Sequence, residues 1–86
     1  MHSFLFTFQN THQALNAEKK AKKGKLSCRL IPTPTEIFAE CGFSLEIKMN
    51  EEEYEAVSEK GTFAFADCYM IAQTEQNRRL YEKINT

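Results

Sequence analysis

The sequence predicts a single α+β domain with a ferredoxin-like βαββαβ fold, in which a four-stranded antiparallel sheet carries two helices on one face. Three observations lead to this prediction. The 86 residues suffice for one domain and are too few for two. Hydrophobic residues make up 42% and charged residues 27% of the chain, as in ordinary globular domains. Strand-type and helix-type patterns alternate along the chain in the order that this fold requires.

The first strand and the first helix occupy the N-terminal part of the chain. An aromatic residue stands at every second position of the strand, at Phe4, Phe6 and Phe8. This alternation is typical of a strand. Residues 12–23 follow with a helical pattern. Either Asn10 or Thr11 can cap this helix, and Gln13 lies three residues after Asn10, close to a capping-box spacing. Gly24 is a suitable residue to end that helix.

Two further strands are separated by a proline-rich turn. Residues 26–31 form the first of them, and Pro32 and Pro34 end it because neither proline can donate to a strand ladder. A short helical turn over residues 35–40 is then compatible with the sequence. Residues 43–49 alternate regularly between apolar and polar side chains, which predicts a half-buried strand.

The last third of the chain predicts one more helix and one more strand. Asn50 begins the helix, and three acidic residues follow in its first turn, where the helix dipole favours them. The last strand is expected over residues 63–72. We therefore expect a ferredoxin-like domain over residues 1–72, followed over residues 73–86 by a short C-terminal helix or a tail.

The bulk properties of the chain exclude several classes of protein. The net charge of −1 gives no reason to expect nucleic-acid binding. No apolar run approaches the roughly 20 residues that cross a bilayer, and the N-terminus lacks a secretion signal, so we expect a cytoplasmic protein that does not enter membranes. The three cysteines, at spacings of 13 and 27, do not suggest a disulfide framework. With two histidines and no CxxC pair, neither a metal nor another cofactor is expected.

Cys41 is the chemically distinctive residue, because it follows the proline-rich turn and precedes a glycine. In the expected fold, the end of the first strand, the second-to-third connection and the start of the fourth strand share one edge of the sheet. Cys41 should then lie near residues 9–12, where free backbone amides and the positive end of the helix dipole stabilise a thiolate. Gly42 would allow an anion or a partner backbone to approach closely. His12 could add a proton relay or a positive charge.

An opposing effect leaves the direction of the Cys41 pKa shift open. If residues 35–40 are helical, Cys41 lies at the C-terminal end of that turn, which disfavours a thiolate. Glu36 and Glu40 act in the same direction. The other two cysteines are expected to be structural, because Cys28 shares a strand face with leucines and Cys68 lies within the last strand.

Four stretches of the chain carry a family pattern: Phe-Leu-Phe-Thr-Phe at 4–8, Thr-His-x-Ala-Leu-x-Ala-Glu-Lys at 11–19, Arg-Leu-Ile-Pro-Thr-Pro-x-Glu-Ile at 29–37 and Cys-Gly-x-x-Leu at 41–45. Together they resemble a bacterial selenium/sulfur carrier-like family (the DUF3343 group) over roughly residues 3–72. The resemblance implies a ferredoxin-like domain that carries sulfur or selenium on its cysteine. One departure is Thr35, where the family often has arginine. If that arginine helps to bind an anionic adduct, this chain binds such an adduct less well.

The first interpretation is therefore a carrier. Cys41 as a thiolate would accept a sulfur or selenium atom from a donor protein, hold it as a persulfide or selenyl-sulfide, and pass it to an acceptor protein. Thr11 and His12 would stabilise the anion, and the turn formed by Pro32, Thr33 and Pro34 would position the loop. Such a shuttle is a carrier or accessory protein rather than a turnover enzyme.

The second interpretation is a non-catalytic module that binds a small ligand or a protein. It includes a homodimer formed through the sheet face, because several strand residues expected to point outward are apolar or small: Leu5, Thr7, Ala64, Ala66 and Met70. A fully solvated sheet face would be more polar. The dimer is compatible with both interpretations and does not distinguish them.

Overall fold

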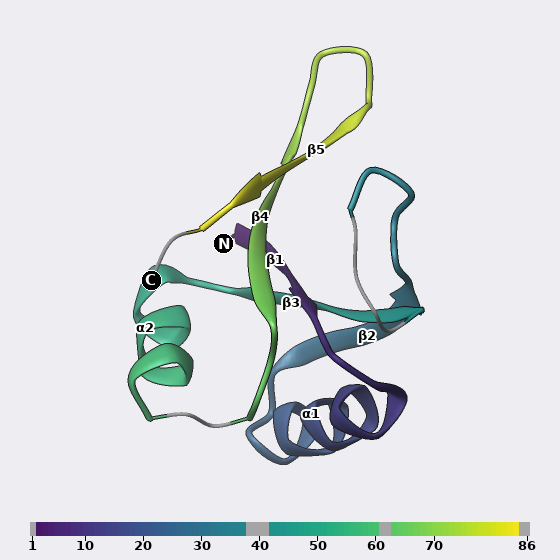
Figure 1. Ribbon diagram of the computed structural model, residues 1–86. Coiled ribbons are helices and arrows are strands. Elements are labelled where there is room, and N and C mark those ends of the chain that lie inside the picture. The colour runs from purple at the N-terminus through teal and green to yellow at the C-terminus, as the bar shows by residue number, and fades with distance from the viewer. Residues whose placement is uncertain (1, 38–41, 61–62, 85–86) are drawn as a thin grey trace.

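In the computed structural model, which describes residues 2–37, 42–60 and 63–84, two helices pack against an antiparallel sheet (Figure 1). The elements in chain order are β1 (His2–Thr7), α1 (Thr11–Lys23), β2 (Ser27–Pro32), β3 (Phe43–Met49), α2 (Glu51–Lys60), β4 (Asp67–Gln73) and β5 (Arg79–Lys83). The expected α+β class, with two helices and an antiparallel sheet, is confirmed. The prediction of a four-stranded sheet is wrong. The sheet has five strands in the order β2-β3-β1-β4-β5, which departs from a simple ferredoxin-like arrangement.

The fifth strand replaces the C-terminal helix or tail that the sequence suggested. A tight turn over residues 74–78 reverses the chain, since the Thr74 amide donates to the Arg78 carbonyl at 2.8 Å and the Asn77 amide donates to the Thr74 carbonyl at 3.0 Å. Asn77 has φ 61°, a conformation that asparagine adopts more readily than most residues. The turn aligns β5 with β4, so that Ile71 pairs with Tyr81.

The main core lies between the sheet and the helices. Phe4, Phe6 and Phe8 contribute the largest buried side chains from β1 and its end. The rest of the buried cluster comes from both helices, two other strands and the segment before β4: Ala14, Ala17, Ala21, Leu45, Ile47, Met49, Val57, Phe63 and Cys68. The ring of Tyr54 on α2 stacks on Phe4 with 4.7 Å between centroids. Because α1 and α2 share this cluster, both helices cover the same face of the sheet.

Of the two residues that could cap α1, Asn10 does so, and Asn50 caps α2. The Asn10 side chain accepts a hydrogen bond from the Gln13 amide at 2.9 Å. The Asn50 side chain accepts from the Glu53 amide at 2.7 Å, and the Glu53 carboxylate accepts from the Asn50 amide at 3.1 Å, which completes a capping box. At the end of α1, the left-handed residue is Lys25, with φ 61°, rather than the preceding glycine.

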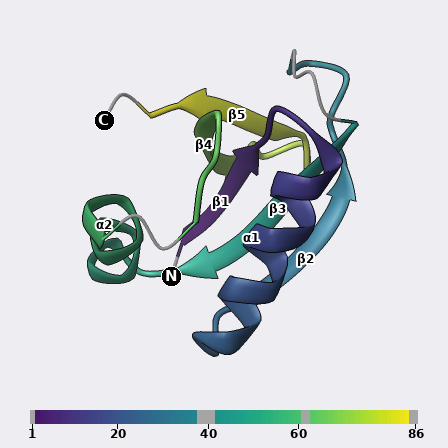
Figure 2. The same ribbon diagram turned by 60° about the horizontal axis from the view of Figure 1, so that its bottom comes forward.

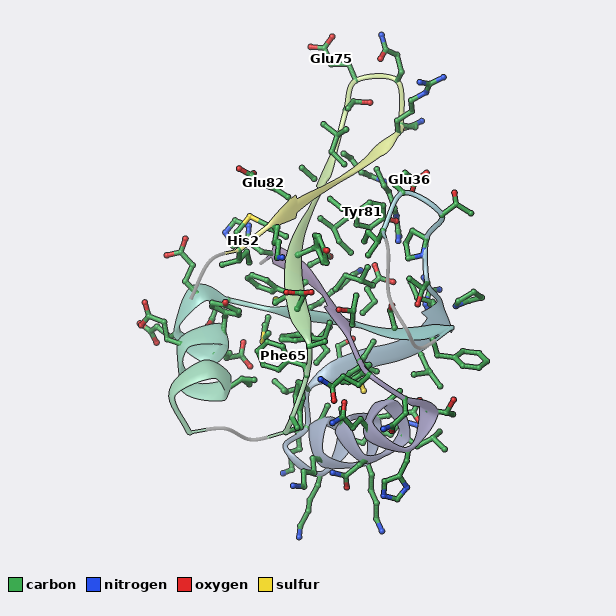
Figure 3. The ribbon with its side chains drawn as sticks, in the orientation of Figure 1. His2, Glu36, Phe65, Glu75, Tyr81 and Glu82 are labelled. Atoms are coloured by element: carbon green, nitrogen blue, oxygen red, sulfur yellow. The ribbon has the colours of Figure 1, made fainter. Side chains whose placement is uncertain are left out.

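The sheet face away from the helices is partly covered by the chain itself. Arg79 of β5 lies 3.3 Å from Glu46 of β3, although β1 and β4 separate these strands in the sheet. Three strand spacings in a flat sheet amount to about 14 Å, so the β4–β5 hairpin must curl over this face. Figures 1 and 2 show the hairpin and residues 33–37, the described part of the β2–β3 connection, on the side of the sheet opposite to α1. Tyr81, half-buried, and Glu82, exposed, leave β5 on opposite sides (Figure 3).

This curl removes the premise of the expected dimer through the sheet face. Leu5 and Thr7 point to that face, but they are 0% and 1% exposed within the chain itself. Met70 pairs with Phe4 and therefore points toward the helices. Ala64 and Ala66 precede β4 rather than lying within a strand. These residues do not form the free apolar face on which the expectation was based.

Candidate functional site

The strand register brings the expected segments to one end of the sheet. Thr7, at the end of β1, pairs with Ser44 near the start of β3 and with Asp67 at the start of β4. Ser44 in turn pairs with Ile31 near the end of β2. The end of the first strand, both ends of the β2–β3 connection and the start of β4 therefore lie in one row, as the sequence predicted.

The proline-rich turn is anchored at the base of the β2–β3 connection. Pro32 is the last residue of β2 and pairs with Phe43. Its missing amide hydrogen is tolerated because β2 is an edge strand. The Thr33 amide donates to the Gly42 carbonyl at 2.9 Å, and the Thr33 hydroxyl lies 2.8 Å from the hydroxyl of Ser44. These bonds fix both ends of the connection against the sheet.

The connection then turns sharply before it reaches Cys41. The Ile37 amide donates to the Pro34 carbonyl at 3.0 Å, and Ile37 is buried. Cys41, the predicted reactive residue, lies outside the described residues. Gly42 is exposed, and a Cβ atom placed on it would meet no atom within 4 Å. The backbone beside Cys41 is therefore open to an approaching molecule.

Thr11 and His12 form the first residues of α1 and are both exposed. Figures 1 and 2 place this helix end and the β2–β3 connection at the same end of the sheet. The Asn10 side chain accepts a hydrogen bond from the Gln13 amide, and the Asn10 carbonyl accepts one from the Ala14 amide. Within the described part of the chain, the amides of Thr11 and His12 have no protein acceptor, so this helix end keeps donors for an anion.

The other two cysteines are poor thiolates, as expected of structural residues. Burial raises the pKa of Cys68 to about 12, and only a weaker effect of the Tyr54 hydroxyl opposes this. Burial also raises the pKa of Cys28; the carboxylate of Glu18 adds to this rise and Lys22 counteracts it. Both side chains contact the helix-side core.

Sequence reasoning missed a charged cluster on the other face of the sheet. Glu46 is buried there between Arg29 and Arg79, at 3.0 and 3.3 Å. The alternation of β3 placed Glu46 on the outward face with Ser44 and Lys48. Nothing local indicated that it would be buried, because the arginine that covers it belongs to the unpredicted strand β5.

The described residues contain neither a metal-binding group nor a helix able to span a membrane. Across residues 2–37, 42–60 and 63–84, no three histidine, cysteine, aspartate or glutamate side chains lie together as a metal-binding group. No helix within those same ranges has the length and hydropathy needed to span a bilayer.

Comparison with known proteins relates the chain to a protein family. Residues 3–70 match the model of the family described as "Putative Se/S carrier protein-like". Neither a curated protein nor a solved structure matches the chain significantly. The family match begins within β1, includes α1, β2, the β2–β3 connection with Cys41, β3 and α2, and ends within β4. Because it spans most of the 86 residues, the chain belongs to the Se/S carrier protein-like family.

Proposed function

We propose that this protein carries a sulfur or selenium atom on Cys41 and passes it between partner proteins. Membership of the Se/S carrier protein-like family supports a carrier role in general terms, and the matched residues include Cys41. The assignment to Cys41 rests on one observation: the pKa values of the other two cysteines are raised by burial. At neutral pH a thiol with a pKa of about 12 is ionised in roughly one molecule in 100,000, which makes Cys68 a poor nucleophile.

The proposed transfer needs no external oxidant. The Cys41 thiolate attacks the terminal sulfur of a persulfide on the donor protein. The sulfur–sulfur bond of the donor breaks, and its electron pair leaves with the donor thiolate. Cys41 then carries the persulfide, and an acceptor thiolate repeats the same exchange to regenerate the Cys41 thiolate. Selenium replaces the terminal sulfur in the selenyl-sulfide version.

A helix N-terminus that can stabilise an anion lies at the same end of the sheet as the described part of the β2–β3 connection, which supports the proposal. Among the described residues, the amides of Thr11 and His12 at this helix N-terminus have no protein acceptor, and a helix N-terminus stabilises negative charge. Gly42 leaves space for a partner protein to reach the adjacent residue. The bonds from Thr33 to Gly42 and Ser44 hold the connection at a fixed place on the sheet.

Thiol reactivity in the folded protein tests this assignment. We expect limited iodoacetamide at neutral pH to label Cys41 first, as located by peptide mass spectrometry. Cys41→Ser should abolish the fast phase of labelling, whereas the matched variant Cys28→Ser should keep it. Equal, slow labelling of Cys41 and Cys28 would remove the basis for the carrier role of Cys41.

A further inference from the structure

A buried carboxylate organises two arginines on the sheet face away from the helices. The side chain of Glu46 is 7% exposed, and its two oxygens contact different guanidinium groups. Oε2 accepts from Nη2 of Arg29, its cross-strand neighbour on β2, at 3.0 Å. Oε1 lies 3.3 Å from Nη2 of Arg79, which comes from β5. Glu46 therefore fixes two guanidinium groups from opposite edges of the sheet.

Two hollows meet at this cluster and form what we call the basic groove. They have volumes of about 320 and 300 Å³ and share Glu46, Lys48 and Arg79 as lining residues. The remaining lining residues are Ser27, Cys28 and Arg29 in the first hollow, and His2, Ser3, Ile71 and Gln73 in the second. Each volume reaches the lower end of the range of roughly 300–1,000 Å³ found for small-molecule sites.

The positive charges that line the basic groove outnumber its negative charge. Arg29, Lys48 and Arg79 oppose the single charge of Glu46, which leaves an excess of two in a chain whose net charge is −1. Lys48 is exposed and, among the residues that the structure describes, has no ion-pair partner. A guanidinium group has five donors, so both arginines retain donors beyond those that face Glu46. One arginine would have been enough to neutralise the carboxylate.

We propose that the basic groove binds the phosphate monoester group of a small molecule. Guanidinium groups match the geometry of phosphate oxygens, and an excess of two charges matches a phosphate dianion. The carboxylate of Glu46 holds the arginines in place before the ligand arrives, which reduces the ordering cost of binding. Ile71 offers an apolar surface to the remainder of the ligand.

The basic groove is separate from the site proposed for atom transfer. Its lining residues on β2 and β3 occupy the rows of Ser27 and Lys48 and of Arg29 and Glu46, whereas the β2–β3 connection leaves the sheet beyond the row of Ile31 and Ser44. The nearest of these groove residues, Arg29 and Glu46, lie two residues, or about 7 Å, along the strands from that row. Binding at the groove can therefore be tested independently of Cys41.

Titration of the full ¹⁵N-labelled chain, followed by NMR, tests the proposal with three probes: AMP, inorganic phosphate and adenosine. We expect saturable shifts of the Arg29, Lys48 and Arg79 amides with AMP, weaker saturable shifts with phosphate, and none with adenosine. No saturable shift with AMP, or shifts confined to α1, would overturn the proposal. Phosphate binding as tightly as AMP would overturn the assignment to a monoester.

A pair of matched variants distinguishes the groove from general attraction between charges. Lys48→Ala removes an exposed cation from the groove, and we expect AMP to bind about tenfold more weakly. Lys23→Ala removes an exposed cation from the end of α1, and AMP binding should not change. Cys41→Ser should also leave it unchanged. Equal weakening by the two lysine variants would contradict a specific site.

Discussion

The contact between Arg79 and Glu46 is predicted to hold the β4–β5 hairpin over the sheet, and Arg79→Ala tests this directly. Hydrogen bonds to buried charged groups contribute about 1.5–3 kcal/mol, whereas exposed ion pairs contribute about 0–1 kcal/mol. Glu46 is buried, but the Arg79 side chain is 38% exposed, and Arg29 remains to neutralise the carboxylate in the variant. We therefore expect Arg79→Ala to lower the free energy of unfolding by about 1–2 kcal/mol.

Urea denaturation followed by circular dichroism measures this loss, and Arg78→Ala is the matched control. Arg78 is an exposed neighbour that has no ion pair within the described chain, and its substitution removes the same charge. For a domain of this size, the expected loss lowers Tm by about 5–15 °C. Hydrogen exchange should also show faster opening of the β5 amides in Arg79→Ala. If both variants lose the same small amount of stability, the contact does not hold the hairpin.

Three further predictions concern stability. The pKa of Cys68 is raised to about 12 in the folded state, so the folded protein holds the thiol proton more tightly than the unfolded chain does. The resulting contribution to the free energy of unfolding is complete below pH 9 and is lost as the pH rises from 9 toward 12. Urea midpoints across this range should fall less steeply in Cys68→Ala, and equal slopes would contradict the assigned burial. Asn10→Ala should lower the free energy of unfolding by about 1 kcal/mol, because it removes the cap of α1. Asn16→Ala, at an exposed position of the same helix, should cause no such loss. Equal losses of stability in thermal unfolding would argue against the cap. Gly42→Ala should leave Tm unchanged, because the added methyl group meets no atom within 4 Å, and a clear drop in Tm would show that the site is not open.

Local sequence signals predicted the elements whose formation depends on near neighbours. The alternation in β1 and β3 and the caps at Asn10 and Asn50 are each set within a few residues. The predicted start of β4 at Phe63 was too early for a physical reason. Phe63 and Phe65 both pack edge-on against Phe6, at 5.1 and 4.9 Å between centroids, so their alternation reflects core packing before the strand begins.

Contacts between distant segments could not be predicted in the same way. The spacing of Leu80 and Ile84 is compatible with a helix, and only pairing with β4 selects a strand. Glu46 is buried because the curled hairpin brings Arg79 over β3, which no local pattern encodes. For the proposed transfer site, the sequence correctly predicted which segments meet at one end of the sheet, whereas Cys41 itself lies outside the described residues.

The most direct test of the carrier role is to locate a transferred atom. The folded protein is incubated with a low-molecular-weight persulfide, and the added sulfur is mapped by peptide mass spectrometry without reduction. We expect one added sulfur atom on the peptide that contains Cys41, and none on that peptide in Cys41→Ser. Sulfur found only on Cys28 or Cys68, or no stable adduct at all, would contradict the proposal that Cys41 carries the atom.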